Sequence, residues 1–433
     1  MAPILIAVLS FWLRIWHLGT PKGYVFDEVY YAKGAKELLR YGVEYTGSSP
    51  EFIVHPPVGK WCIALGIKLF GNNEFGWRIS SAIVGAILIY LVAVIAQYLF
   101  HSKTLSALAA LLMALDGLEL VHSRTALLDL FLTFFIVLAL YALLKERYWL
   151  AGIFFGLAIG TKWNGLYFLV AFGPFVIYRD FVRSRWDDGR KFLRTLLTRS
   201  VQFFLLPIGV YIASWTGWFI SPHGWDRHWA QNHSSSWGFI PAPFRSLWHY
   251  HAEILNFHTT LTTHHPYQAN PWSWLVMGRP TSFFYESPKT CGAKACAQEV
   301  LALGTPILWW LGTFAIAVVL GFWIRSVAKS ETDKVAGFIL LAIAAGYVPW
   351  FLFQKRTMFS FYAIAFEPFL ILALVYCAKL ILGEEPWSRN RKLTVVFIVL
   401  VIAANFIYFL PIFTGSVITY NSWYHHMWLP SWI

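Results

Sequence analysis

Charged residues are scarce in this chain. Asp, Glu, Lys and Arg make up 13% of its 433 residues, whereas 58% are hydrophobic. Soluble domains carry roughly 25% charged residues, so the composition excludes an ordinary soluble protein. Aromatic residues are abundant at 19%, and 23 residues are Trp. Trp and Tyr favour the membrane–water boundary, because the ring is apolar while its N–H or O–H needs a polar partner. The composition therefore predicts a membrane protein with many spans.

Cysteine is also scarce, with four residues in the whole chain. Cys62 and Cys377 lie in or beside apolar runs, as small buried thiols do. Cys291 and Cys296 lie in a polar loop with four residues between them. This spacing allows a short disulfide if the loop faces an oxidising compartment.

Long apolar runs recur along the chain. A bilayer core about 30 Å thick needs roughly 20 apolar residues per helix, and this criterion predicts about eleven spans. They lie near residues 1–19, 80–100, 104–121, 125–144, 148–162, 163–179, 200–220, 305–325, 335–353, 358–381 and 393–412. The first run has no small-residue cleavage pattern after it, so we expect a span rather than a signal peptide. Residues 1–433 are expected to form a single all-α integral membrane domain.

The loops predict the orientation. The formal net charge is +12, but the basic residues lie mostly between apolar runs, which favours a role in topology and argues against nucleic acid binding. The basic segments 179–199, 325–334 and 389–392 fall on one side with Lys145 and Arg147. Cytoplasmic loops carry the excess of Lys and Arg. This side and the N-terminus are therefore expected in the cytoplasm, and the C-terminus outside.

Two long loops, 20–79 and 221–304, then face the outside. The first contains amphipathic stretches such as Tyr30 to Tyr41, which we expect to lie as helices in the interface plane. The second is rich in His: His223, His228, His233, His249, His251, His258, His264 and His265. No HExxH motif or Cys/His ligand spacing accompanies them, so we expect no metal site there.

The presence of basic residues at the outer boundary requires an explanation, because positive charge is rarer on that side of the membrane. They are Arg124, Lys162, Arg279, Lys355 and Arg356. One hypothesis is that several converge on an anionic headgroup such as a phosphate. The other is that each extends to the interface or pairs with a carboxylate. Because they gather on one face, we favour the phosphate hypothesis for the group.

Acidic residues form the complementary set. Asp27 and Glu28 follow the first span, where one could act as a general base, although spacing alone favours the simpler interpretation of an acid pair at a helix N-terminus. Asp129 lies inside an apolar run, which predicts either a functional site or a structural ion pair. Glu74 and Arg78 could pair along a helix at i,i+4.

The order of short motifs resembles the protein O-mannosyltransferases, and specifically their actinobacterial branch. Phe26-Asp27-Glu28 looks like the family's acidic motif, and His55-Pro56-Pro57 with Gly59-Lys60 resembles its next block. The later motifs are Phe75-Gly76-Trp77-Arg78, Ser123-Arg124 with Leu127-Leu128-Asp129, Lys162-Trp163 with Gly165-Leu166, Pro271-Trp272-Ser273-Trp274 with Arg279-Pro280, and Pro349-Trp350 with Arg356 and Phe359. Each motif is weakly specific, but the ordered set covers nearly the whole chain.

The resemblance implies a GT-C fold of about eleven helices, the number that span length also predicts. It implies an enzyme that transfers mannose from a polyprenyl phosphate to Ser or Thr hydroxyls of secreted proteins. The family's catalytic acid falls on Asp27, with Glu28 beside it. The donor phosphate, or the fold around it, is assigned to Arg78, Arg124, Lys162, Lys355 and Arg356. Substrate-binding or structural roles are assigned to His55, Asp129, Trp163, Trp274 and Arg279.

One departure from the family is clear. Eukaryotic members carry a β-trefoil insertion in the second outer loop, and 221–304 is too short to hold it. This favours an enzyme of a bacterial cell membrane, with its active site outside the cytoplasm. The partners implied are polyprenyl-phosphate-mannose, secreted acceptor proteins and the lipid bilayer, with the secretion channel as a further partner that the activity allows.

The expected reaction inverts the sugar configuration in one step, and fixed cations take the place of a metal at the leaving phosphate. No cofactor is expected. A related GT-C enzyme that moves another lipid-linked sugar to a lipid or glycan is the nearest alternative. A transporter is disfavoured, because the chain shows neither duplicated halves nor broken helices near the midplane.

Overall fold

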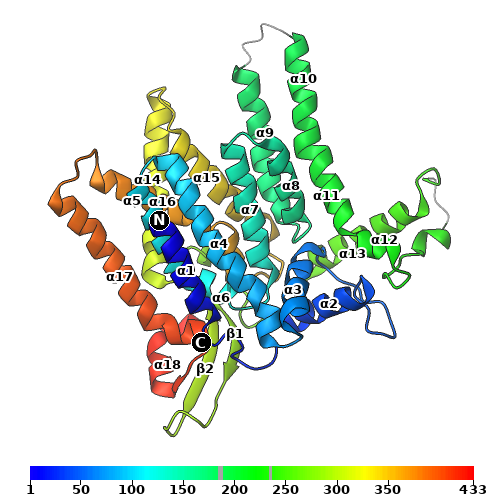
Figure 1. Ribbon diagram of the computed structural model, residues 1–433, viewed down its shortest axis with the longest axis horizontal. Coiled ribbons are helices and arrows are strands. Elements are labelled where there is room, and N and C mark those ends of the chain that lie inside the picture. The colour runs from blue at the N-terminus through cyan, green and yellow to red at the C-terminus, as the bar shows by residue number, and fades with distance from the viewer. Residues whose placement is uncertain (184–188, 234–236) are drawn as a thin grey trace.

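The computed structural model of the protein describes residues 1–183, 189–233 and 237–433 and is mostly helical (Figure 1). One set of helices forms a bundle. It comprises α1 (Ala2–Ile15), α4 (Glu74–Phe100), α5 (Lys103–Ala114), α6 (Gly117–His122), α7 (Leu128–Leu144), α8 (Tyr148–Ile159), α9 (Gly165–Arg183), α10 (Gly189–Ser200), α11 (Leu206–Ser214), α14 (Pro306–Ala328), α15 (Lys334–Tyr347), α16 (Glu367–Leu382) and α17 (Arg389–Thr414). A π-helical turn, Val201–Leu205, joins α10 to α11.

Six helical segments are long and apolar enough to cross a membrane, within the part of the chain that the structure describes. They are Glu74–Phe100, Gly165–Arg183, Gly189–Ser214, Pro306–Ala328, Lys334–Phe353 and Arg389–Thr414. Four further apolar helices, α1, α5, α7 and α8, are shorter. Each predicted span overlaps a helix, and the total of eleven spans stays a prediction.

Several predicted boundaries differ from the structure because capping residues decide where a helix begins. The predicted span 80–100 starts earlier, at Glu74, because the Asn73 side chain accepts a hydrogen bond from the Gly76 N–H at 2.9 Å. The predicted span 104–121 is broken after Ala114, and the Asp116 side chain caps the short helix α6. Capping groups sit in single polar residues, which a hydropathy average over about 19 residues does not detect.

The core of the bundle surrounds α7. This helix is apolar on all sides, and residues such as Leu130, Phe131 and Ile136 are fully buried. It packs between α4 and α8, while α14 packs on α16. A helix that is hydrophobic all round is either buried in its protein or spans a membrane, and the full burial of these side chains places α7 in the interior. The bundle is therefore built around α7.

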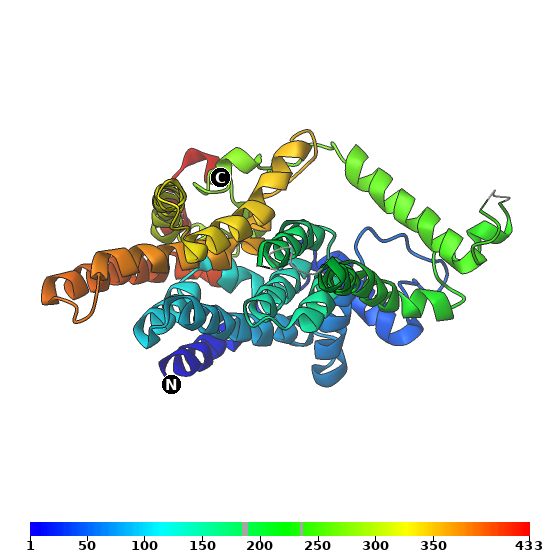
Figure 2. The same cartoon turned by 90° about the horizontal axis from the view of Figure 1, so that it is seen from above.

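The other elements gather at one end of the bundle, the lower end in Figure 1. They include α2 (Glu28–Tyr41) and α3 (Val58–Phe70) from the first long loop, and α18 (Tyr420–His426) near the C-terminus. The second long loop contributes α13 (Ala242–Thr260), and the short helix α12 (Thr216–Ile220) directly precedes that loop. Seen from above, α13 extends to one side of the bundle (Figure 2).

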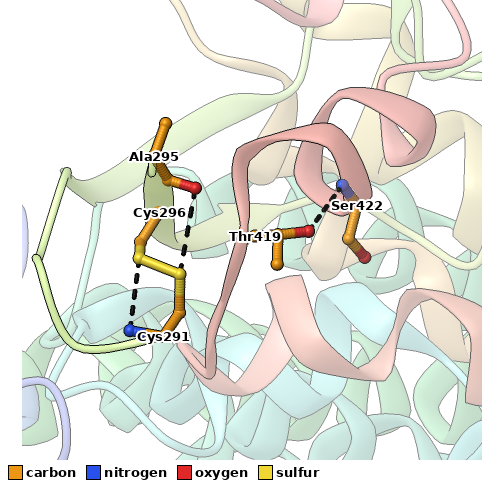
Figure 3. The surroundings of a disulfide bond; sticks show 5 residues. All are labelled: Cys291, Ala295, Cys296, Thr419 and Ser422. Carbon is orange, nitrogen blue, oxygen red and sulfur yellow. Dashed lines mark hydrogen bonds between the residues drawn. A yellow bond between two sulfur atoms is a disulfide. The ribbon is translucent and has the colours of Figure 1, made fainter. Parts of the chain in front are cut away.

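A small sheet accompanies these helices, and the all-α prediction did not anticipate it. Strands β1 (Thr281–Glu286), β2 (Cys296–Ala302) and β3 (Val417–Thr419) pair antiparallel in that order. Every residue of β2 is buried, and the strand packs against α17 and α6. A disulfide joins Cys291 to Cys296 at the end of the hairpin loop (Figure 3).

Candidate active site

Asp27 stands directly before α2 on a turn that its neighbour Phe26 enters with a positive φ of 50°. The Asp27 side chain makes no capping bond to the helix. Its Oδ2 instead accepts a hydrogen bond from the Tyr31 hydroxyl at 3.3 Å. The Phe26 ring stacks on Phe283 of β1, with ring centroids 4.8 Å apart, and so holds the turn against the small sheet. The Asp27 carboxylate does not cap α2 and is therefore available to accept a proton from a substrate.

Burial raises the pKa of Asp27 to about 6. The nearby charge of Lys162 lowers this pKa, Asp129 raises it, and the hydrogen bond from Tyr31 lowers it. A carboxyl group with a pKa near neutrality is still ionised at pH 7 and is a stronger base than an exposed Asp. These features fit a general base.

Glu28 has a different environment. Its two carboxylate oxygens accept bonds from Arg78 Nε and Nη2, both at 2.8 Å. They also accept the backbone N–H groups of Val25 at 2.8 Å and Ala126 at 2.9 Å. Both charged side chains are fully buried. Glu28 therefore locks the turn before α2 to α4 and to the segment before α7.

Arg78 uses all five of its N–H donors inside the protein. Besides Glu28, it donates to the carbonyl oxygens of Leu18, Pro21 and Gly23. A guanidinium has five donors, so none remains for a phosphate. Of the two roles expected for Arg78, the geometry supports the one in the fold around the site. The i,i+4 pair with Glu74 does not form, since Glu74 accepts from the Gly23 N–H instead.

Arg124 likewise binds backbone carbonyls. Its Nη1 donates to Leu13, Arg14 and Trp16, and its Nη2 to His17. These carbonyls end α1, where a helix has unpaired acceptors and a partial negative charge. Arg124 thus fixes the end of α1, and the geometry favours a structural role over phosphate binding.

Lys162 occupies the break between α8 and α9 and pairs with Asp129. Its Nζ lies 3.0 Å from both carboxylate oxygens, and both side chains are largely buried. The ammonium also lies 4.9 Å from the centre of the Tyr362 ring. For Asp129 the sequence predicted either a functional site or a structural ion pair. The structure is consistent with both, because Asp129 forms an ion pair with Lys162 and that pair lies beside Asp27. The pair holds a cation at one wall of a cavity.

The cavity contains about 700 Å³ of empty space, part of it open to solvent. It lies between α9, α13 and the 3-10 segment Val348–Phe353. Its polar lining includes His55, Lys162, Asn164, His258 and Arg356. Its aromatic lining consists of Trp163, Tyr167, Trp350, Phe353 and Tyr362. A cavity with an apolar wall and a few converging cations suits a lipid that carries an anionic headgroup.

Arg356 is half-buried and donates from Nη2 to Nδ1 of His258 at 3.1 Å, whereas its neighbour Lys355 is exposed. Trp163 lines the same cavity, and its indole N–H donates to the Tyr211 hydroxyl at 3.0 Å. His55 faces Tyr31 and His258, at centroid distances of 6.1 Å and 5.3 Å. These contacts connect the cavity to the helix that Asp27 begins.

Two predicted residues lie elsewhere. Trp274 is fully buried, donates to the Ala269 carbonyl at 3.0 Å and packs against Trp350 from behind the cavity. Arg279 donates to the carbonyl oxygens of Pro266, Ser431 and Ile433. Trp274 and Arg279 therefore stabilise the fold and do not line the cavity.

Three residues near the site were not assigned to it from the sequence: Tyr31, Tyr362 and His258, the last of which was noted only as one of the loop histidines. Tyr31 follows Asp27 by four positions, so the i,i+4 rule could have found it. Tyr362 and His258 reach the site only through tertiary packing. Within residues 1–183, 189–233 and 237–433, no three His, Cys, Asp or Glu side chains gather to hold a metal ion.

The fold defines the class of protein. The structure resembles the S. cerevisiae protein O-mannosyltransferase Pmt1-Pmt2 complex bound to the sugar donor, with a TM-score of 0.82 and 16% identity over 100% of this chain and 92% of that chain. This is a multi-pass membrane protein with the GT-C fold.

The sequence comparisons identify the family. The model of the dolichyl-phosphate-mannose-protein mannosyltransferases matches residues 4–73 and 69–220, and the model of the C-terminal four-span region of protein-O-mannosyltransferase matches 243–432. Polyprenol-phosphate-mannose–protein mannosyltransferase of Mycolicibacterium smegmatis is 35% identical over 99% of this chain and 92% of its own length. The Mycobacterium tuberculosis protein of the same name is 34% identical over 96% and 87%. The chain belongs to the protein O-mannosyltransferase family.

Proposed function

We propose that this protein transfers mannose from polyprenyl-phosphate-mannose to Ser or Thr hydroxyls of secreted proteins, at the outer face of a bacterial cell membrane. The observation that carries the proposal is the half-buried Asp27 carboxylate beside the Lys162–Asp129 pair, next to a cavity that Lys162 and Arg356 line. The names of the mycobacterial relatives support the choice of sugar, lipid and acceptor.

In the proposed reaction, Asp27 accepts the proton of the acceptor hydroxyl. The hydroxyl oxygen forms a bond to the anomeric carbon on the face opposite the phosphate. The bond from that carbon to the phosphate oxygen breaks, and its electron pair leaves with the polyprenyl phosphate. The configuration is inverted, and no covalent intermediate forms.

The leaving phosphate gains negative charge as this bond breaks. Lys162 and Arg356 line the cavity, where fixed cations stabilise the transition state more than the ground state. Lys355 lies exposed beside Arg356 and adds positive charge next to it. We assign Glu28, Arg78 and Arg124 to holding the turn and helix ends around Asp27.

Two outer loops, 20–79 and 221–304, carry the site in this proposal, since they supply Asp27, His55 and His258. The basic segments between the other spans would face the cytoplasm with the N-terminus, because Lys and Arg accumulate in cytoplasmic loops. The C-terminus would lie outside.

The function is tested with the purified protein in lipid, mannosyl-phospho-polyprenol and a Ser/Thr-rich secreted peptide. We expect mannose on the peptide hydroxyls, detected by mass spectrometry, and an inverted anomeric configuration by NMR. Transfer to a lipid or glycan instead of the peptide would favour the related GT-C activity and contradict this proposal.

The same assay tests metal independence. Because the cations of the protein would stabilise the leaving phosphate, we expect excess EDTA to leave the rate within about twofold. Loss of activity that Mg²⁺ or Mn²⁺ restores would show that a metal takes part in the reaction.

A further inference from the structure

His258 connects two parts of the chain that lie far apart in the sequence. It stands near the end of α13, and its Nε2 lies 2.9 Å from the carbonyl oxygen of Val54 in the first outer loop. Its Nδ1 lies 3.1 Å from Nη2 of Arg356, in the segment that follows α15. The His258 ring also faces His55 and Trp163 of the cavity wall. One side chain thus contacts three elements that line the cavity.

The two hydrogen bonds define the protonation state of His258. A carbonyl oxygen only accepts, so Nε2 must carry the proton that binds Val54. A guanidinium only donates, so Nδ1 must be the unprotonated acceptor for Arg356. Both bonds therefore require the neutral ring. Burial, followed by the charges of Arg356 and Lys162, lowers the pKa of His258 to about 4 even though the hydrogen bond to Val54 raises it, which is consistent with a neutral ring.

The bond to Val54 also orients the His258 ring itself. α13 holds the first outer loop at a second point, where the Ile53 N–H donates to the Tyr250 hydroxyl at 3.0 Å. His55, the residue after Val54, lines the cavity. The same backbone segment therefore sets the position of His55 and the orientation of His258.

Arg356 has few other restraints. Nη2 bonds to His258, and Nε is buried without a hydrogen-bond partner among the residues that the structure describes. Without His258, this long side chain would lose the contact that selects one rotamer. An anion site made of a mobile arginine must order it at each binding event, and that ordering costs affinity.

We propose that neutral His258 is a positioning residue, which holds the Arg356 guanidinium in the cavity for the donor phosphate and couples it to the first outer loop. The proposal rests on the proposed role of Arg356. Arg356 remains the group that contacts phosphate, and His258 acts through it.

The test compares His258→Leu with His258→Gln. A Gln side chain can accept from Arg356 through its oxygen and donate to Val54 through its amide N–H, whereas Leu can do neither. We expect His258→Leu to raise the KM for mannosyl-phospho-polyprenol about tenfold or more, the scale of one lost hydrogen bond to a charged group. The KM for the peptide should change far less. His258→Gln should recover most of the donor KM.

A matched control is His249→Leu on the same helix, where the histidine bonds Asp226 at 3.1 Å and stacks on Trp229, away from the cavity lining. It should leave the donor KM close to that of the wild type. An equal rise in His249→Leu, or a rise in His258→Leu that Gln does not reduce, would overturn the proposal, because helix damage would then explain the loss.

Binding of polyprenyl phosphate, with polyprenol as the uncharged control, separates this proposal from the proposed function. His258→Leu should weaken binding of polyprenyl phosphate and leave polyprenol binding unaltered, whether or not mannose is transferred. If the wild type binds polyprenyl phosphate but transfers no mannose, the proposed function fails while this binding difference still supports the role of His258. Equal binding of polyprenyl phosphate by both proteins would refute that role.

Discussion

At the scale of single residues, adjacent side chains of the same charge have different roles. Asp27 and Glu28 are neighbours, but Glu28 accepts four hydrogen bonds from protein donors while Asp27 accepts one, from Tyr31. Arg356 and Lys355 differ in the same way, since only Arg356 lines the cavity. The difference lies in which partners each side chain reaches, and it leads to two predictions.

The first concerns Asp27 as the general base. Asp27→Asn should lower kcat at least about a hundredfold, the usual scale for losing such a group. In the wild type, kcat should fall as the pH drops below about 6, because the carboxyl group is then protonated and cannot accept the hydroxyl proton. The measurements are kcat at saturating donor and its pH profile. Asp226→Asn, at an outer acid that bonds His249, is the control. A near-normal rate in Asp27→Asn would remove Asp27 from this role.

The second concerns the phosphate. Arg356→Ala should raise the donor KM more than the peptide KM, because it removes a cation from the cavity wall. Lys355→Ala should act in the same direction but more weakly, since Lys355 is exposed to solvent and its charge is screened. Steady-state kinetics with each substrate varied in turn measures both effects. A change confined to the peptide KM would mean that these residues face the acceptor instead.

At the scale of elements, buried arginines join segments that are distant in the sequence. Arg78 ties α4 to the turn before α2, Arg124 ties the segment before α7 to the end of α1, and Arg14 of α1 pairs with Glu119 of α6. These contacts lie at or near the end of the bundle that carries the small sheet, and they fix the frame that presents Asp27. A buried pair is costly to break, because the remaining charge is left without a partner.

Arg78→Ala should therefore lower the free energy of unfolding by about 3–5 kcal/mol. The double variant Glu28→Gln, Arg78→Met should lose less, since no buried charge is left unpaired. Arg183→Ala is the control, because Arg183 pairs with Glu146 where both side chains are more than half exposed. Denaturant unfolding in detergent measures each variant. Equal stability of Arg78→Ala and Arg183→Ala would contradict the structural role of Arg78.

At the scale of the whole molecule, the two long loops and the small sheet lie at one end, while the turn from α14 to α15 lies at the other (Figure 1). The distribution of Lys and Arg predicts which end is cytoplasmic. The site then faces the side on which secreted proteins are exposed, as the proposed acceptors require.

Labelling of single cysteines tests this orientation. In a background with Cys62→Ala and Cys377→Ala, a membrane-impermeant maleimide should react with Ser48→Cys in intact cells. It should react with Lys329→Cys only after lysis. Both positions are exposed, so access is set by the membrane alone. The reverse pattern would invert the topology and contradict an active site outside the cytoplasm.

The sequence by itself determined the membrane class, the approximate helices and, through its ordered motifs, the family. Hydrophobicity is a sum over many residues, so the apolar runs at 80–100 and 393–412 predict α4 and α17 despite errors at their ends. A family resemblance is likewise spread over the whole chain. The hydrophobic runs and the family resemblance are therefore recognisable even where the role or position of a single residue is predicted wrongly.

Only the tertiary structure decided how the charged residues are used. From the sequence and the family resemblance, Arg78, Arg124, Lys162 and Arg356 were all assigned to the donor phosphate or the fold around it. The fold gives Arg78 and Arg124 enough carbonyl and carboxylate partners inside the protein, while it places Lys162 and Arg356 in the cavity. The role of a buried charged side chain is determined by the few groups within hydrogen-bond distance of it. For Arg78 and His258 those groups come from segments about fifty to two hundred residues away, and only the folding of the chain brings them together.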